Sequence, residues 1–358
     1  LIDLPDGFLQ VLETYLRECS DDCNTGVTVD TVHKASVAVQ VLTILSRNFS
    51  NIPFVSTSEA VPLTIVISSA VANQYTKHSK DATDQNTAGF LLSVLTFLEV
   101  LYDPHLIWQM TCSRVSVDTT KCRVSPSHLH LEVIPFFYDC LSSKPCFLPA
   151  AVQMKLIHVF GAIICGAQHN AQVAINHNTV DILFQRLREQ ECSLEVKMTA
   201  VRCIMQGIVT LCACVPEARK VDLNEFVREY LGTLSRLMTE EEKPTQVDTA
   251  QWMMTGLQEL LSTNGNAALK KVFHNNELIE RLIRSLHGTR LKSNSAQKIA
   301  ASSVRLIHVF LSRFPFAKKH FASMQGYRTL FSTLKTLGEP HQATLEALLE
   351  WLVEETPR

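Results

Sequence analysis

Apolar side chains recur along this chain at intervals of three and four residues. Examples are the apolar positions between Val32 and Leu45, between Leu91 and Leu101, and between Val152 and Ile163. Such spacing places them on one face of an α-helix. The pattern predicts helices over residues 6–19, 31–48, 62–74, 87–102, 131–142, 149–166, 179–189, 194–214, 223–238, 246–262, 277–287, 295–312, 327–337 and 342–355. The alternating pattern of β-strands is not found, so an all-α fold is expected.

Two connections between the predicted helices are long. Residues 75–86 are almost entirely polar, and residues 111–128 are rich in Ser, Thr and Val with few large apolar side chains. Segments of this composition are typical of surface connections. We therefore expect both to be exposed loops.

The chain contains an internal repeat. The five residues Leu156–Phe160 recur letter for letter as Leu306–Phe310, and a weaker third copy starts at Leu257. Each copy lies in a predicted long helix that is followed by a short helix and then by another amphipathic one. This order is typical of an armadillo unit, which has a period of roughly 40–47 residues. His158 and His308 occupy equivalent positions, where we expect a packing or capping role.

A single unit of this kind cannot bury its own apolar face, whereas stacked units bury it against their neighbours. The sequence therefore predicts one armadillo/HEAT-like α-solenoid over residues 1–358, with a concave groove. One compact bundle is the alternative, but so many helices around a single centre exceed the size at which single cores stop growing. Because the chain begins with Leu1 and not with Met, we expect it to be a fragment of a larger protein.

Composition indicates a folded chain in a reducing compartment. Apolar residues make up 46% of the 358 residues, which excludes a mostly disordered chain, and the formal net charge is −2. Eleven cysteines are scattered along the sequence and no signal peptide precedes them, so reduced thiols and a cytoplasmic location are expected. The longest apolar stretch, Leu156 to Ala167, is too short to span a bilayer.

None of the common catalytic or phosphate-binding motifs is present. We find no P-loop, no G-x-G-x-x-G, no G-x-S-x-G and no H-E-x-x-H, and we therefore expect neither an enzyme nor a cofactor or small-molecule substrate. One metal hypothesis stays open: Cys112, Cys122, His128 and His130 could form a tetrahedral zinc site, although their spacing matches no familiar finger. The alternative is that the cysteines are small core residues.

Basic residues concentrate in the C-terminal third. Thirteen Lys and Arg lie between Lys270 and Gly338, where Glu277 and Glu280 are the only acidic residues. One interpretation is a surface for an anionic partner, either a lipid surface or an acidic protein segment. The candidate residues are Lys270, Lys271, Arg281, Arg284, Arg290, Lys292, Lys318, Lys319 and Arg328. The other interpretation is a set of solvated charges spread around several helices. Nucleic acid is the least favoured partner, because no aromatic residues interleave with the basic ones.

Several strings resemble the N-terminal helical region of neurobeachin-like proteins of the BEACH family. They occur in family order and span nearly the whole chain, roughly residues 40–355. The strings are Ile44–Asn51, Leu98–Pro104 with Trp108 following, Val133–Tyr138, Leu156–Ile163, Ala317-Lys318, Gly326-Tyr327 and Leu337–Pro340. Two stretches depart from the family pattern, Glu350–Glu355 and the segment 111–128, and they leave the paralogue open.

The resemblance implies a function that residue chemistry alone does not. Members of this family are very large cytosolic scaffolds that associate peripherally with endomembranes and act in vesicle trafficking and granule biogenesis. Their N-terminal part is an armadillo-like solenoid, and their lectin-like, PH, BEACH and WD40 modules lie outside the region that this chain resembles. The family offers no catalytic residues to transfer. The expected partners are proteins of the trafficking machinery, with an anionic membrane surface as the alternative.

Overall fold

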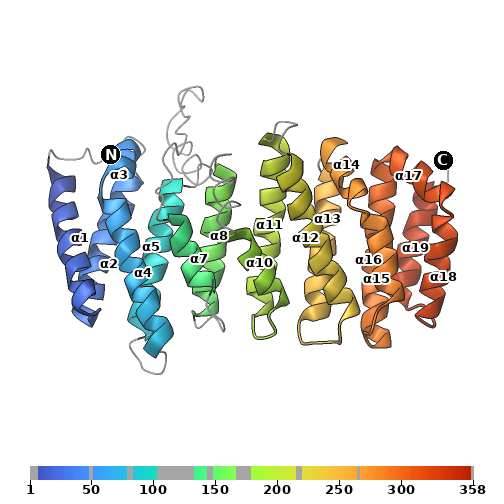
Figure 1. Cartoon of the computed structure of the whole chain (residues 1–358), viewed down its shortest axis with the longest axis horizontal. Helices are drawn as coiled ribbons and strands as arrows, with labels where there is room; N and C mark the ends of the chain where they lie inside the picture. Colours follow the sequence, from blue (N-terminus) through green and yellow to red (C-terminus); the bar gives the residue numbers. More distant parts are fainter. Residues whose placement is uncertain are drawn as a thin grey trace. The chain divides into compact units, whose positions relative to one another are not determined.

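The computed structural model describes residues 7–47, 51–78, 84–102, 133–142, 148–166, 179–214, 220–263 and 267–355. Within these ranges the regular structure is helical and contains no strand, which confirms the all-α prediction (Figure 1). The chain divides into two compact units, Leu1–Ile182 and Leu183–Arg358. Each unit is therefore described by itself.

The first unit contains seven helices among the described residues. They are α1 (Phe8–Thr25), α2 (Val29–Ser46), α3 (Ile52–Thr57), α4 (Ala60–His78), α5 (Asp84–Tyr102), α7 (Val133–Ser142) and α8 (Ala150–Gly166). They stack in two rows, since α4 packs against α1 and α7, and α5 packs against α2 and α8. The apolar faces that the sequence predicts are buried here: Val39 and Leu42 of α2 and Leu95 and Leu98 of α5 are fully enclosed.

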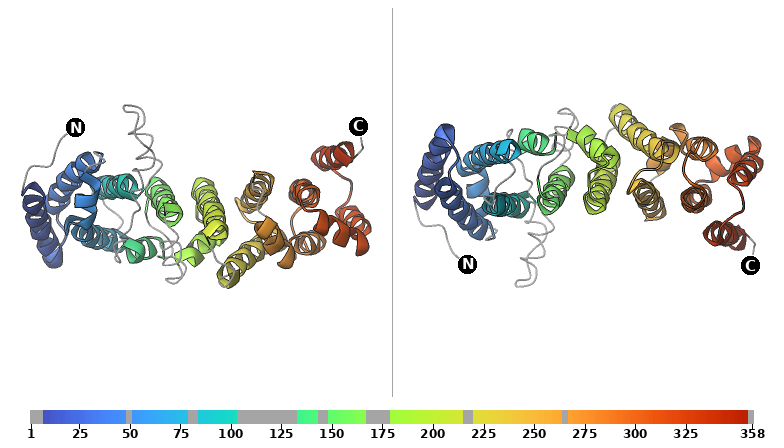
Figure 2. Two further views of the ribbon diagram at one scale, coloured as in Figure 1. Left: turned by 90° about the horizontal axis from the view of Figure 1, so that it is seen from above. Right: turned by 90° about the horizontal axis from the view of Figure 1, so that it is seen from below.

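The second unit begins within α10 (Thr179–Arg188) and repeats this arrangement. Its other helices are α11 (Leu194–Cys214), α12 (Lys220–Thr239), α13 (Gln246–Thr263), α14 (Ala267–Asn275), α15 (Leu278–His287), α16 (Ser293–Arg313), α17 (Pro315–Ser323), α18 (Gly326–Thr336) and α19 (Gln342–Glu355). One row runs α11, α13, α16, α19 and the other runs α12, α15, α18, each helix packing on the next. Figure 2 views these helices nearly end-on.

Buried glutamine side chains tie successive layers of the second unit together. The Gln246 amide donates to the Leu237 carbonyl at 2.6 Å, which joins the start of α13 to the last turns of α12. Gln297, on α16, donates to the Leu337 carbonyl and accepts from the Thr344 hydroxyl, so it holds the connection between α18 and α19. Because both glutamines are almost completely buried, these hydrogen bonds satisfy groups that would otherwise cost free energy.

Glu242 makes a second tie, between the α12–α13 turn and the start of α16. Its carboxylate accepts hydrogen bonds from the Lys292 backbone N–H at 3.0 Å and from the Ser295 hydroxyl at 2.8 Å. The bond from the Lys292 backbone, followed by the bond from Ser295, holds the pKa of Glu242 below its usual value, because both stabilise the ionised form. This carboxylate therefore contributes stability only while it is ionised.

We expect Glu242→Gln to lower the midpoint of thermal unfolding at pH 7 and to have no effect in acid. The folded-state pKa of Glu242 lies below the unfolded value of about 4.3, so its contribution is present above that value and is lost as the pH falls through the folded pKa. Circular dichroism melts between pH 7 and pH 3 measure the difference. Glu241→Gln, at the exposed neighbouring position, is the control. A deficit of the same size at every pH would contradict this role.

Each helix range predicted from periodicity coincides with a helix, and the errors lie at the ends. The predicted loop 75–86 is wrong on both sides, because α4 continues to His78 and α5 already begins at Asp84. Polar end turns carry no apolar period, so a pattern method stops short of them. The helix α3 is missed for a similar reason: six residues are too few to show a period. The predicted loop 111–128 and the hypothetical zinc ligands lie outside the described residues.

The internal repeat is reproduced in part. Leu156–Phe160 and Leu306–Phe310 both lie in long helices, α8 and α16, and the short helix α17 follows α16 as expected. The two equivalent histidines differ, however. His308 is buried and stacks on Trp351 with ring centroids 5.4 Å apart, which confirms its packing role, whereas His158 is mostly exposed and lies 3.2 Å from Glu99.

The cysteines on α1 are core residues rather than reactive thiols. Cys19 is buried and Cys23, one turn later, is half-buried, and both are free. Burial, with smaller contributions from the neighbouring Cys19 and Asp22, raises the pKa of the Cys23 thiol to about 11. Burial also raises the pKa of Cys19. Since the thiolate is the nucleophile and the metal ligand, both thiols are inert near neutral pH.

Candidate interaction surface

The structure places four of the nine predicted basic residues on two short helices that touch. Lys270 and Lys271 lie on α14, and Lys318 and Lys319 lie on α17, two short helices at the same end of the second unit (Figure 1). These four residues are called the lysine cluster below. The helices touch through the ring of His274, whose centroid lies 5.3 Å from that of Phe316.

Two residues flank this contact closely on the helix surfaces. Lys270 lies one turn before His274, and Lys319 lies one turn after Phe316, so both side chains project beside the touching rings. Phe316 is itself 61% exposed. Burial and the neighbouring His320 lower the pKa of His274, which keeps that ring uncharged at neutral pH. Lys270 and Lys319 therefore lie about one helical turn from the contact between His274 and the exposed Phe316.

Two other predicted residues lie elsewhere. Arg290 and Lys292 follow the C-terminus of α15, whereas α14 precedes its N-terminus, and a ten-residue helix separates the two by about 15 Å. Glu242 lies beside Lys292, so acidic groups oppose the basic ones at this end. The nine residues thus do not form one continuous patch. The nine residues were grouped because they lie close together in sequence. The helix α15, however, separates the residues that precede it from those that follow it.

The remaining three residues occupy the helices between these ends. Arg281 and Arg284 are on α15, and Arg328 is exposed in the first turn of α18. Arg284 lies 3.9 Å from Glu277, and both side chains are more than half exposed. An ion pair in such a setting contributes little, so Arg284 is available to an external anion.

A cavity of about 420 Å³ opens between α15, α17 and α18. Its floor is apolar, with Ile279 and Ile283 on α15 and Phe321 on α17, and hydroxyl groups of α18 lie along its rim. The Phe321 ring packs directly on Gly326, where an added Cβ would overlap the ring. Because Gly326 has no side chain, the Phe321 ring can occupy this space and form part of the floor. We call this cavity the α15–α18 groove.

Gly326→Ala is expected to destabilise the second unit by about 1–3 kcal/mol, because the Phe321 ring must move to admit the methyl group. Gly232→Ala is the matched control, since a Cβ there, inside α12, meets no atom within 4 Å. It should stabilise by about 0.5–1 kcal/mol, because alanine replaces glycine in a helix interior. Urea unfolding of both variants gives the comparison. Equal effects would contradict the tight packing at Gly326.

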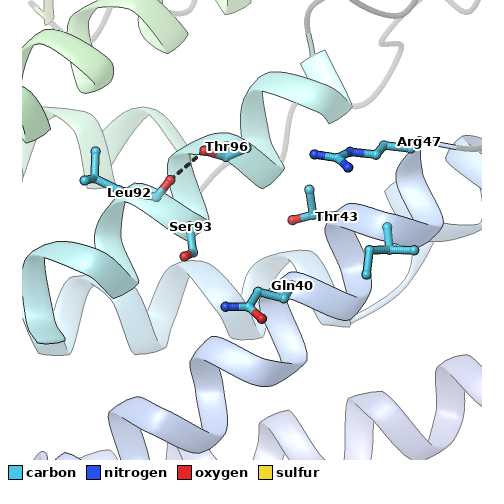
Figure 3. Close-up of a pocket in the computed structure, with 7 residues that line it drawn as sticks. Gln40, Thr43, Arg47, Leu92, Ser93 and Thr96 are labelled. Atoms are coloured by element: carbon cyan, nitrogen blue, oxygen red, sulfur yellow. Dashed lines mark hydrogen bonds between the residues drawn. The ribbon is translucent and has the colours of Figure 1, made fainter. Parts of the chain in front are cut away.

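A second cavity, of about 360 Å³, lies between α2 and α5 in the first unit (Figure 3). Its hydroxyls are already used: Thr43 donates to the Val39 carbonyl and Thr96 to the Leu92 carbonyl, both at 2.8 Å. The amide of Gln40 and the guanidinium of Arg47 remain as its distinctive polar groups. Ile44 and Leu92 add apolar surface to this lining.

The outer faces of α18 and α19 expose large apolar side chains. Leu345 is 46% exposed, Leu349 59% and Phe331 69%. On α19 the opposite face, with Ala347 and Trp351, is buried against α16. The helical pattern alone does not predict this exposure, although α19 carries apolar residues on both sides, more than packing on one side requires.

The described residues hold no group of three or more His, Cys, Asp or Glu side chains placed to bind a metal ion. In the same part of the chain, no helix combines the length and apolarity needed to cross a bilayer. No protein-family model matches this sequence.

Proposed function

We propose that this chain is a non-enzymatic scaffold that binds protein partners of the vesicle-trafficking machinery. In this proposal the helix rows form an armadillo/HEAT-like solenoid of a neurobeachin-like, BEACH-family protein, which organises granules or endomembranes from the cytoplasm. Two features support it. The family strings occur in order along the sequence, and the helices of each unit stack in rows as repeat units do.

The exposed apolar faces of α18 and α19 carry the argument for protein binding. On α19, Ala347 and Trp351 are buried, and α16 packs against this helix. On α19 the second apolar side, with Leu345 and Leu349, faces solvent. Exposing apolar side chains to water costs free energy that burial against another surface recovers, and in this proposal that surface belongs to a partner protein.

Proximity labelling in cells tests this proposal. The chain, carried in its natural protein and fused to a labelling enzyme, should label proteins of endomembrane trafficking. The triple substitution Phe331→Glu, Leu345→Glu and Leu349→Glu should remove a subset of them, since charge on these faces opposes apolar contact. Val11→Glu, Val37→Glu and Val66→Glu are the matched control, at exposed apolar positions of the first unit. Identical labelling by both triple variants, or no trafficking proteins at all, would reject the proposal.

A second candidate function is binding to an anionic membrane surface. The observation in its favour is the lysine cluster, which lies on the same two touching helices as the exposed ring of Phe316. Lysines attract anionic headgroups, and an aromatic side chain is well suited to the interface between headgroups and acyl chains. In this proposal the second unit would help to hold the scaffold at its membrane.

A further inference from the structure

Four aromatic rings meet where α14 contacts α17. The ring of His274, on α14, lies 5.2 Å from that of His320 and 5.3 Å from that of Phe316, measured between centroids. Both of these partners are on α17, and both rings are nearly perpendicular to His274. Phe314, directly before α17, lies 5.8 Å from His274. Edge-to-face contacts of this kind are favourable between uncharged rings. The packing that joins the two helices therefore contains two titratable side chains.

Glu280, on α15, is the carboxylate beside this pair. It lies 3.9 Å from Nδ1 of His320, and its charge also acts on His274. Glu277, which precedes α15, lies 3.9 Å from Arg284 instead. One carboxylate carries one negative charge, so Glu280 can balance one protonated imidazole but not two.

The other charged side chains on the helices around the pair are mostly basic. They are Lys270 and Lys271 on α14, Arg281 and Arg284 on α15, Arg313 at the end of α16, Lys318 and Lys319 on α17, Arg328 on α18, and the exposed Glu225 and Arg228 on α12. The groups whose charge shifts the pKa of His274 are His320 and Glu280. The charge balance of the contact therefore depends mainly on these three side chains.

Mild acid opposes the contact. Burial, followed by His320, lowers the pKa of His274 despite the opposing effect of Glu280. The usual pKa of histidine is about 6.5. A group whose folded pKa is lowered stabilises the contact above its unfolded pKa, and this contribution is lost as the pH falls through the folded pKa. Below that pH two positive rings would lie 5.2 Å apart and repel each other.

We infer that His274 and His320 form a pH-sensitive latch, which holds α17 on α14 while both rings are uncharged and releases α17 when both are protonated. The inference rests on the ring geometry and does not depend on the proposed protein-binding function. The released helix carries Phe316, Lys318 and Lys319. Protonation would therefore separate the two halves of the lysine cluster.

Hydrogen–deuterium exchange of the whole chain at pH 7.5 and pH 5.5, corrected for the intrinsic pH dependence of exchange, tests the inference. We expect the amides of α17 to become at least tenfold less protected at pH 5.5, while those of α13 keep their protection. His274→Phe keeps an uncharged ring in the contact, so it should hold α17 at both pH values. His341→Gln, at an exposed position of the same unit, is the control and should behave as the parent does. Glu280→Gln should move the release to higher pH, because no carboxylate then balances a protonated ring.

Equal protection of α17 in the parent at the two pH values would overturn the inference. A loss in His274→Phe as large as that in the parent would also overturn it, because this variant gains no proton at the contact. His320→Phe repeats the test from α17, in case the first variant already loosens the helix at pH 7.5. In that variant too, a loss equal to that of the parent would contradict the latch.

Discussion

Reversing the charge of the lysine cluster, with Lys270→Glu, Lys271→Glu, Lys318→Glu and Lys319→Glu, is expected to abolish binding to anionic vesicles. Each lysine near an anionic bilayer contributes about 1 kcal/mol, so loss of four weakens the affinity by about 1,000-fold even before the new repulsion is counted. Flotation with phosphatidylcholine vesicles, with and without phosphatidylserine, measures the effect. Binding of the parent should also fall as salt is added, because exposed charges are screened.

A matched variant separates this local effect from net charge. Arg228→Glu, Arg236→Glu, Arg290→Glu and Lys298→Glu change the net charge of the protein equally, at exposed positions of the same unit away from the lysine cluster. This variant should keep most of the binding. Phe316→Ala should weaken binding without changing its salt dependence, since the ring carries no charge. A parent protein that ignores phosphatidylserine, or two quadruple variants that lose binding equally, would rule out a membrane role for the cluster.

Tyr230→Ala is expected to destabilise the second unit by about 3–5 kcal/mol, the usual cost of truncating a fully buried aromatic side chain. Tyr230 is completely enclosed on α12, and its ring packs edge-to-face on Phe184 with centroids 6.5 Å apart. Its hydroxyl donates to the Met253 carbonyl at 2.7 Å, which ties α12 to α13. Burial raises the pKa of this hydroxyl well above its usual value, so the donor stays protonated throughout the working range of pH.

Tyr230→Phe divides this loss into its two causes. It keeps the ring and removes only the hydrogen bond, so a loss of about 0.5–1.5 kcal/mol is expected. Urea unfolding followed by circular dichroism measures both variants, and equal slopes against urea would show that the unfolded states are comparable. Tyr138→Phe, at a 40% exposed position of the first unit, should change stability by less than about 0.5 kcal/mol. If Tyr230→Phe cost as much as Tyr230→Ala, the ring packing would not be the main contribution.

The candidate surface shows which features can be predicted from the order of residues alone. Counting charges singles out Lys270 and Lys271, and Lys318 and Lys319, because the two members of each pair are adjacent in sequence. Arg290 was counted with them, and the structure places it beyond the opposite end of α15 from α14. Neither the α15–α18 groove nor its floor could be predicted in this way. Ile279, Phe321 and Gly326 meet only when three helices pack, and nothing local in the sequence indicates which faces will leave a gap.

The amino-acid sequence by itself determined the helices. Apolar residues at intervals of three and four define a face that must leave water, and this local rule recovers the position of every long helix and the burial of residues such as Val39 and Leu98. This rule did not predict the helix ends or the short helix α3, because polar turns and six-residue segments show no apolar period.

Tertiary packing alone decided which apolar faces stay exposed and which equivalent residues become different. His158 and His308 share a five-residue string, yet one lies beside Glu99 at the surface and the other is buried on Trp351. Leu345 and Leu349 carry the same signature as a core stripe but face water, because α16 covers only the other side of α19. Whether an apolar face is buried depends on which element packs against it. Periodicity identifies the face but not the element that covers it.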